Sequence, residues 1–180
     1  MQALPINAQL EKNEVGLQDG SIVTIRKIRA DDVDRLIDFS TRLSSETKYS
    51  RYLSYRRAFS ESEATQLCTT QAGIRMALVA EVEGWGETNI VGLAEYEKMA
   101  ADMAEVGIVV ADQSQGLGLG THMLNELVKY AKREGLNVFA ASVHPDNTRI
   151  LNFIQKSELP LKKHLSYGAW EFQVKLAENR

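Results

Sequence analysis

One stretch near the middle of the chain constrains the fold more than any other. An apolar run over residues 104–110 is followed by a short polar segment, by the alternating glycines Gly116, Gly118 and Gly120, and by the start of a helical pattern. This order is typical of a buried strand, a tight loop and a helix. The small residues let a ligand approach the peptide N–H groups of the loop, and the helix adds unpaired N–H groups and the positive end of its dipole. The sequence therefore predicts an anion site here, for a phosphate or a pyrophosphate.

Hydrophobic periodicity along the rest of the chain predicts strands and helices in a single domain. Strand-like runs are found at 22–28, 76–82, 89–97, 104–110, 137–143 and in two runs between 162 and 176. Helical spacing with suitable capping residues is found at 31–43, 60–70, 119–134 and 146–156. Residues 1–13 are polar and aperiodic and are expected to form a flexible extension to one domain over 14–180. The order of the elements predicts a mixed α/β layer architecture.

Composition and charge exclude several function classes. The formal net charge of −3 argues against a nucleic-acid or anionic-membrane surface. No apolar run approaches the ~20 residues of a membrane span, and the N-terminus lacks a signal pattern, so a cytoplasmic location is expected. Cys68 is the one cysteine, which excludes an internal disulfide and predicts a small core residue. The three histidines show no metal-ligand spacing, so no metal is expected.

The glycine loop can be compared with three kinds of phosphate-binding loop. A mononucleotide P-loop requires a lysine after its last glycine, whereas Thr121 follows Gly120 here. A dinucleotide loop has the spacing Gly-x-Gly-x-x-Gly near the first strand of its unit, which matches neither the spacing nor the position here. The third comparison fits. Gln115-x-x-Gly118-x-Gly120 resembles the Gln/Arg-x-x-Gly-x-Gly/Ala acyl-CoA loop of the GNAT N-acetyltransferases.

The resemblance to the GNAT family extends from about Ile22 to Val174, with the elements in GNAT order. Segments 26–32 and 43–52 are similar to the GNAT domain of bacterial protein lysine acetyltransferases, which is often fused to an NDP-forming acyl-CoA synthetase. No synthetase portion is present in these 180 residues, so the resemblance implies a free-standing relative. It also implies a single GNAT-type α/β domain, with a central mixed, mostly antiparallel sheet flanked by helices.

The resemblance also implies where acetyl-CoA, the acyl donor, would bind. The strand at Ile108, Val109 and Val110 would offer its backbone to the pantetheine arm, as a strand accepts a peptide. Asn147 would be a further coenzyme contact. The pyrophosphate would be held by the loop and the first helical turn, which are Gln115, Gly116, Leu117, Gly118, Leu119, Gly120 and Thr121. The alternative is a turn that binds nothing, but three glycines weaken a fold, which favours a ligand.

Acyl transfer to an amine requires a nitrogen with a free lone pair. A lysine amine, with a pKa of ~10.4, is mostly charged at neutral pH, so a base or a desolvating pocket must remove its proton. Glu105 begins the apolar strand, where the lysine-acetylating relatives carry a glutamate, and it is the expected base. The alternative for Glu105 is an exposed strand-end carboxylate or an ion-pair partner. Glu95 and Glu97 are rivals for the role, and by alternating with Tyr96 they would share one strand face.

The sequence departs from the family pattern after Asn147. Many GNAT enzymes carry a tyrosine acid seven residues further on, and Ile154 stands there. Either the thiolate leaves with the help of water, or Ser157, Tyr167 or His144 donates the proton, or the protein does not catalyse. A non-catalytic acyl-CoA sensor of the GNAT fold is therefore the alternative function.

The expected function is the direct transfer of an acetyl group from acetyl-CoA to a primary amine, on a small molecule or a protein lysine. Aromatic and basic side chains gather over residues 49–57, in a region that overhangs the acceptor site in the GNAT architecture. Ordinary packing of a helical turn is the alternative interpretation of that cluster. The C-terminal strands could pair across a homodimer, although no residue decides this.

Overall fold

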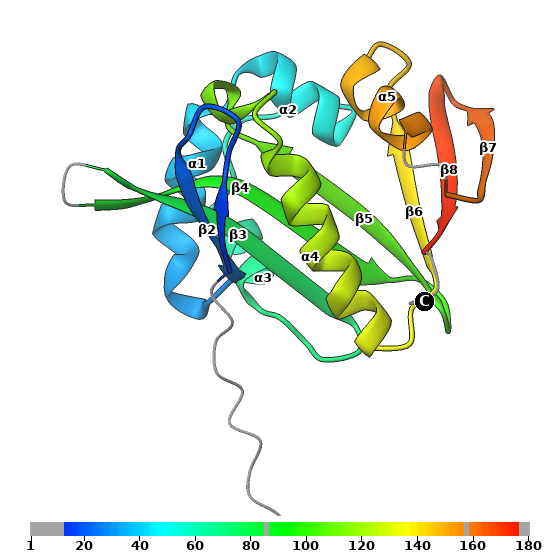
Figure 1. Ribbon diagram of the computed structural model, residues 1–180, viewed down its shortest axis with the longest axis horizontal. Helices are drawn as coiled ribbons and strands as arrows, with labels where there is room; N and C mark the ends of the chain where they lie inside the picture. The colour runs from blue at the N-terminus through cyan, green and yellow to red at the C-terminus, as the bar shows by residue number, and fades with distance from the viewer. Residues whose placement is uncertain (1–12, 85–86, 157–158, 177–180) are drawn as a thin grey trace, which may run out of the picture.

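The structure, a computed structural model, describes residues 13–84, 87–156 and 159–176. Eight strands form one sheet in the order β1-β2-β3-β4-β5-β6-β8-β7 (Figure 1). The strands are β1 (Asn13–Gly16), β2 (Ile22–Lys27), β3 (Arg75–Gly84), β4 (Glu87–Lys98), β5 (Met103–Val110), β6 (Val138–Val143), β7 (Leu161–Ser166) and β8 (Ala169–Lys175). The helices are α1 (Val33–Arg42), α2 (Ser45–Tyr52), α3 (Glu61–Cys68), α4 (Leu119–Arg133) and α5 (Thr148–Lys156), with 3-10 turns η1 (Ala30–Asp32) and η2 (Asp112–Ser114). Residues 1–12 of the predicted extension lie outside the described residues, and Asn13 begins β1.

The sheet is mixed and mostly antiparallel, as predicted. Neighbouring strands pair in the antiparallel sense except for β5 and β6, which run parallel. α4 crosses one face of the sheet over β3, β4 and β5, whereas α1 and α3 cover the opposite face (Figure 1). β4 packs against α4 and α1, and β5 packs against α4 and α2.

The long helix α4 follows the predicted apolar face. Met123, Leu127 and Ala131 are fully buried. A Cβ at Gly92 on β4 would lie 2.6 Å from the Met123 sulfur, so glycine at this position lets the helix approach the sheet closely. Gly135 follows the helix end in a left-handed conformation, with φ of 77°. α4 has 15 residues, and no helix in the described part of the chain is both long and apolar enough to cross a membrane.

The sequence does not predict β1 or α2. β1 has four residues that alternate between half-buried and exposed, so its apolar signal is weak. α2 has no buried residue, so it shows no apolar periodicity along its eight positions. Its start is set by a cap instead, because Ser44 Oγ accepts a hydrogen bond from the Thr47 N–H at 3.1 Å. Both elements depend on contacts with distant segments, which a local pattern does not reveal.

Candidate active site

A wedge opens between the parallel strands β5 and β6. β5 pairs with β4 from Ala104 to Val110, but with β6 only at residues 103–105. Beyond that point β6 continues to pair with β8, and the described residues form no further β5–β6 pairs. Figure 1 shows the two strands diverging, with α2 and α5 near the open end. We name this opening, bordered by 106–110 of β5, the β5–β6 wedge. Ile108, Val109 and Val110 lie on it, where an extended ligand could lie along the strand.

The predicted anion site lies directly beyond the wedge, in the glycine loop (residues 115–120). Gly116 and Gly118 have φ of 78° and 93°, a region that side-chain-bearing residues rarely adopt. Gly118 caps α4 without any side-chain hydrogen bond. In the described residues, no partner accepts from the backbone N–H groups of residues 116–120. Five free donors therefore coincide with the positive end of the 15-residue helix α4, as an anion site requires.

The two ends of the predicted pyrophosphate segment differ from its middle. The Gln115 N–H donates to the Asp112 carbonyl at 3.3 Å, and the Thr121 N–H donates to the Gly118 carbonyl at 3.1 Å. Asn147 Oδ1 accepts from the Ile150 N–H at 3.3 Å and so caps α5. The roles predicted for Gln115, Thr121 and Asn147 stay predictions, since each of these polar groups also has a partner within the chain.

Side chains tie the glycine loop to the two helices at the wedge. Gln115 Nε2 donates to the Val110 carbonyl at 2.9 Å and to Thr47 Oγ1 at 3.0 Å, while Arg149 donates to Gln115 Oε1. Asp112 accepts from the Ser44 N–H, from Ser44 Oγ at 2.6 Å and from Thr47 Oγ1 at 2.7 Å. Partial burial raises the pKa of Asp112, but these hydrogen bonds outweigh it and hold that pKa below its usual range. The start of α2 is thus fixed to the loop.

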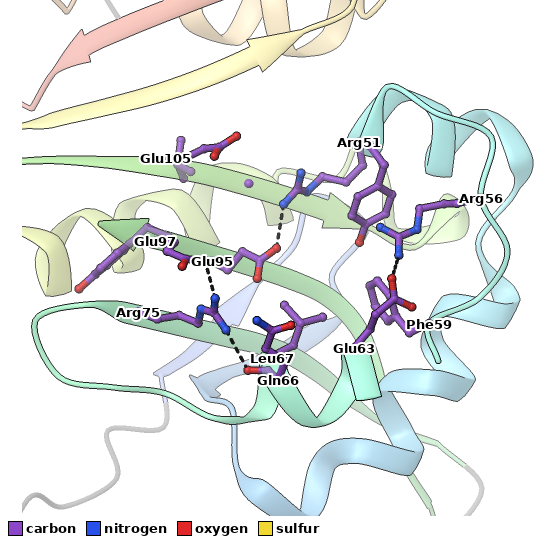
Figure 2. A pocket seen from close by; sticks show the side chains of 14 residues that line it. Arg51, Arg56, Phe59, Glu63, Gln66, Leu67, Arg75, Glu95, Glu97 and Glu105 are labelled. Carbon is purple, nitrogen blue, oxygen red and sulfur yellow. Dashed lines mark hydrogen bonds and ion pairs between the residues drawn. The ribbon is translucent and has the colours of Figure 1, made fainter. Parts of the chain in front are cut away.

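A cavity of about 320 Å³ lies on the face of β4 and β5 that is opposite α4. We name it the β4–β5 cavity. Its walls come from α2, α3 and the three strands β3, β4 and β5 (Figure 2). All three carboxylates proposed from the sequence as candidate bases, Glu95, Glu97 and Glu105, line it. These three carboxylates, which come from the two strands β4 and β5, therefore line one cavity beside the β5–β6 wedge.

The strand register places these carboxylates on one patch of the sheet. Glu97 lies directly opposite Glu105, and Glu95 lies directly opposite Gly107. Alternate residues of a strand point to the same face, so Glu95 and Glu97 share a face of β4, with buried Tyr96 on the other. Directly opposed residues of antiparallel strands also point to the same face, so Glu105 lies on that face as well. Arg75 pairs with Glu97 at 2.5 Å, whereas none of the described residues forms an ion pair with Glu105. Glu105 is exposed, and its carboxylate is available to a ligand.

Glu95 is paired in an unusual way. Its carboxylate accepts from Arg51 Nη2 at 2.8 Å, and Figure 2 shows Arg51 reaching from α2 toward β4. A Cβ at Gly107 would overlap the guanidinium, so this crossing requires glycine in the middle of β5. Burial raises the pKa of Glu95 above its usual range, although Arg51 acts in the opposite direction. Gly107 is a site residue that was not predicted, and the signal for it in the sequence is a glycine inside an apolar strand.

Tyr52 contributes a buried hydroxyl to the same cavity. Its ring lies between two guanidinium groups, 4.9 Å from that of Arg51 and 4.3 Å from that of Arg56. The hydroxyl oxygen is buried and has no hydrogen-bond partner among the described residues. Burial raises the pKa of Tyr52 to about 12, so the hydroxyl stays protonated and can donate. The aromatic and basic residues over 49–57 therefore lie in two different environments. Tyr55 is exposed, whereas Arg51, Tyr52 and Arg56 line the cavity.

The alternatives to the missing tyrosine acid lie in different places. Ile154 is part of α5, as predicted for that segment. His144 follows the end of β6, and its ring centroid lies 5.3 Å from that of Tyr49 on α2. Tyr167 is fully exposed at the turn between β7 and β8, and Ser157 lies outside the described residues. Of the two described side chains, His144 and Tyr167, the geometry brings His144 to α2 beside the wedge. Among the described residues, no group of three or more side chains is arranged to hold a metal.

Comparison with known proteins gives related sequences. The Acetyltransferase (GNAT) domain family matches residues 23–159. Acetyltransferase PA5475 of Pseudomonas aeruginosa is 34% identical over 120 residues, which are 66% of this chain and 64% of that protein. Acetyltransferase Pat of Mycolicibacterium smegmatis is 28% identical over 133 residues, which are 74% of this chain and 40% of that protein. The chain therefore spans less than two thirds of the length of each relative.

Solved structures share the fold. The GNAT domain of S. lividans PAT has a TM-score of 0.83 at 25% identity, covering 92% of this chain and 97% of that chain. The PaiA N-acetyltransferase of Thermoplasma acidophilum, solved in complex with coenzyme A, has a TM-score of 0.67 at 16% identity, covering 86% of this chain and 99% of that chain. The second likeness concerns the fold alone. Because the family match over 23–159 includes the wedge, the glycine loop and the carboxylate patch, the chain belongs to the GNAT acetyltransferase family.

Proposed function

We propose that this protein transfers an acetyl group from acetyl-CoA directly to a primary amine. The observation that carries the proposal is the adjacency of two sites on β5. One side of the strand opens into the β5–β6 wedge with the glycine loop at its end, and one face of the strand carries Glu105 into the β4–β5 cavity. A donor held along β5 and an acceptor held in the cavity would meet at the same strand.

The donor would be held mainly by backbone groups. The pantetheine arm would lie against Ile108, Val109 and Val110, where the described residues offer β5 no strand partner on the β6 side. The pyrophosphate would accept from the N–H groups of Gly116, Leu117, Gly118, Leu119 and Gly120 at the start of α4. In this proposal Gln115 shapes the loop through its side chain, while Thr121 and Asn147 lie at its borders as further contacts.

The reaction would need one base and no metal. Glu105 takes a proton from the acceptor's ammonium group, and the free amine nitrogen attacks the thioester carbon. The nitrogen then releases its second proton to water as the carbon–sulfur bond breaks and the amide forms. A backbone N–H of β5 would stabilise the oxyanion of the tetrahedral intermediate. The coenzyme A thiolate is a tolerable leaving group, and it takes its proton from water, since Ile154 stands where many relatives have a tyrosine.

The acceptor in this proposal is an amine, either a protein lysine or a small molecule. The protein-lysine alternative is favoured by the resemblance of segments 26–32 and 43–52 to the GNAT domain of bacterial protein lysine acetyltransferases. A specific observation supports a second function, a non-catalytic acyl-CoA sensor. Ile154 cannot donate a proton, so the chain departs from the family's catalytic pattern while its glycine loop stays intact.

Calorimetric titration with acetyl-CoA tests the donor site. We expect binding to the wild type and none to Gly118→Glu, because a carboxylate in the loop would repel and obstruct the pyrophosphate. Gly168→Glu is the matched control, since Gly168 has a similar left-handed φ of 84° but lies at the β7–β8 turn. Equal binding by all three proteins would contradict the assigned loop.

Thiol release from acetyl-CoA in the presence of candidate amines tests catalysis. We expect release from the wild type and a large loss in Glu105→Gln, with acetyl-CoA binding retained. Tight acetyl-CoA binding without thiol release from any amine, and without an effect of Glu105→Gln, would favour the sensor over the enzyme.

A further inference from the structure

We propose that the guanidinium of Arg51 holds, in this structure, the position that the acceptor's ammonium group takes during the reaction, and that Glu95 recognises this ammonium once Arg51 is displaced. The assignment rests on the proposed transfer to an amine and names the class of amine that the cavity selects. Glu95 is then a specificity residue, distinct from the base Glu105.

The strand register provides the first argument. Glu95, Gly107, Glu97 and Glu105 occupy the four corners of one patch on paired strands. Three corners carry carboxylates, and the fourth carries no side chain. The guanidinium of Arg51 fills this fourth corner, because a Cβ at Gly107 would overlap it. A cation from another element is thus inserted at the one place in the patch that lacks a side chain.

The position of this cation relative to the proposed reaction provides the second argument. Gly107 lies two residues beyond Glu105 on the same face of β5, at the start of the wedge. An amine that enters through the β4–β5 cavity and attacks a thioester held along β5 must pass over this glycine. Arg51 fills that volume, so the acceptor and the guanidinium compete for one place.

Arg51 can also leave without exposing the core. α2 carries no buried residue, and the Arg51 side chain is 22% exposed. It is held by one hydrogen bond to Glu95 and by its contact with the Tyr52 ring. Arg75 is anchored more firmly, to Glu97 at 2.5 Å and to the Gln66 carbonyl at 3.2 Å. Displacement of Arg51 therefore leaves the rest of the cavity wall in place.

Electrostatics then defines the class of acceptor. The Glu95 side chain is 18% exposed, so its charge is costly to leave unpaired once Arg51 has moved. A primary ammonium restores the ion pair and brings its nitrogen beside Glu105. An acceptor with its own carboxylate beside the amine would be repelled by the three carboxylates of the patch. The cavity therefore selects a primary amine on an uncharged or cationic chain, such as a lysine side chain, over the α-amine of a free amino acid.

Steady-state kinetics with acetyl-CoA and Nα-acetyl-lysine methyl ester tests the assignment. Arg51→Ala is expected to lower KM for the amine roughly five- to tenfold, because the internal competitor is removed. Glu95→Gln is expected to raise that KM about tenfold without changing the Kd of acetyl-CoA. The gain from Arg51→Ala should disappear in the Arg51→Ala/Glu95→Gln double variant. Arg42→Ala is the matched control, since Arg42 pairs with Asp38 on α1 and is not among the residues that line the cavity.

A small guanidinium compound supplies an independent readout. Ethylguanidinium chloride should inhibit Arg51→Ala competitively against the amine and should inhibit the wild type much less. A higher KM in Arg51→Ala, or a lower KM that persists with Glu95→Gln, would overturn the assignment while the wild-type activity still supports the proposed function. Acetyl-CoA binding with no thiol release from any amine would instead remove the proposed acetyl transfer, and this assignment with it.

Discussion

The two halves of the site are made from different parts of the chain. The β5–β6 wedge and the glycine loop offer backbone groups, namely an unpaired strand edge and the N–H groups of residues 116–120. The β4–β5 cavity offers side chains from separate elements, with Arg51 from α2, Glu95 from β4 and Glu105 from β5. A backbone site depends on chain conformation, whereas a side-chain site changes with single substitutions. Donor and acceptor recognition can therefore vary independently in this chain.

The largest effect that separates the two halves is expected from Glu105→Gln. Loss of a general base lowers the turnover of an acyl transfer by about 10²- to 10⁴-fold. The Kd of acetyl-CoA should stay unchanged, because the proposed donor site consists of backbone groups on the other side of β5. Single-turnover acetylation and calorimetry on the same preparation measure the two quantities. An equally large loss of turnover in Glu97→Gln would assign the role of base to the opposed pair Glu97 and Glu105, and not to Glu105 alone.

The same division explains how much could be predicted from the sequence. The glycine loop and α4 produce local patterns, since alternating glycines and an apolar helical face are visible within 20 residues. The cavity produces none, because Arg51 reaches Glu95 over Gly107 only after β4 and β5 have paired. α2 was missed for a related reason, since it buries no residue and is held by Asp112 from a segment 65 residues away.

The second effect concerns backbone conformation in the donor half. Gly116→Ala adds one methyl group with no atom within 4 Å, so its cost arises from the φ of 78° alone. An alanine forced into the left-handed region costs about 1–2 kcal/mol, which the loop can relieve by moving its N–H groups away from the pyrophosphate. We expect acetyl-CoA to bind roughly tenfold more weakly by calorimetry.

Gly168→Ala provides the control for backbone strain. It has a similar φ of 84° and also has no atom within 4 Å, but it lies far along the chain from the loop. It should lower the melting temperature by a similar amount without affecting acetyl-CoA binding. An equal loss of acetyl-CoA affinity in both variants would mean that backbone strain lowers binding through global stability. Acetyl-CoA binding would then not depend specifically on the conformation of the glycine loop.

A third, smaller effect is expected at Asp112, which links the two halves. Asp112→Asn replaces a charged acceptor of hydrogen bonds from Ser44 and Thr47 at the start of α2, and such a bond contributes about 1 kcal/mol. The pKa of Asp112 in the folded protein lies below the unfolded value of about 3.9, so its contribution is present above that pH and is lost as the pH falls through the folded pKa. Urea denaturation should show the wild type and the variant differing at neutral pH and converging in acid. A constant difference across this range would show that the charge of Asp112 is not what holds α2.

The smallest effect is expected from Tyr52→Phe, and its sign tests whether the cavity is built for a ligand. The Tyr52 hydroxyl is buried and finds no partner in the described part of the chain, so its removal should leave the free energy of unfolding unchanged or raise it by about 1 kcal/mol. If the acceptor accepts a hydrogen bond from this hydroxyl, the same substitution raises KM for the amine, because the bond exists only in the complex. The variant would then be at least as stable as the wild type in urea denaturation and yet show a higher KM from thiol release. A stabilised variant with an unchanged KM would mean that the hydroxyl faces no part of the acceptor, and recognition in the cavity would depend on its charged side chains alone.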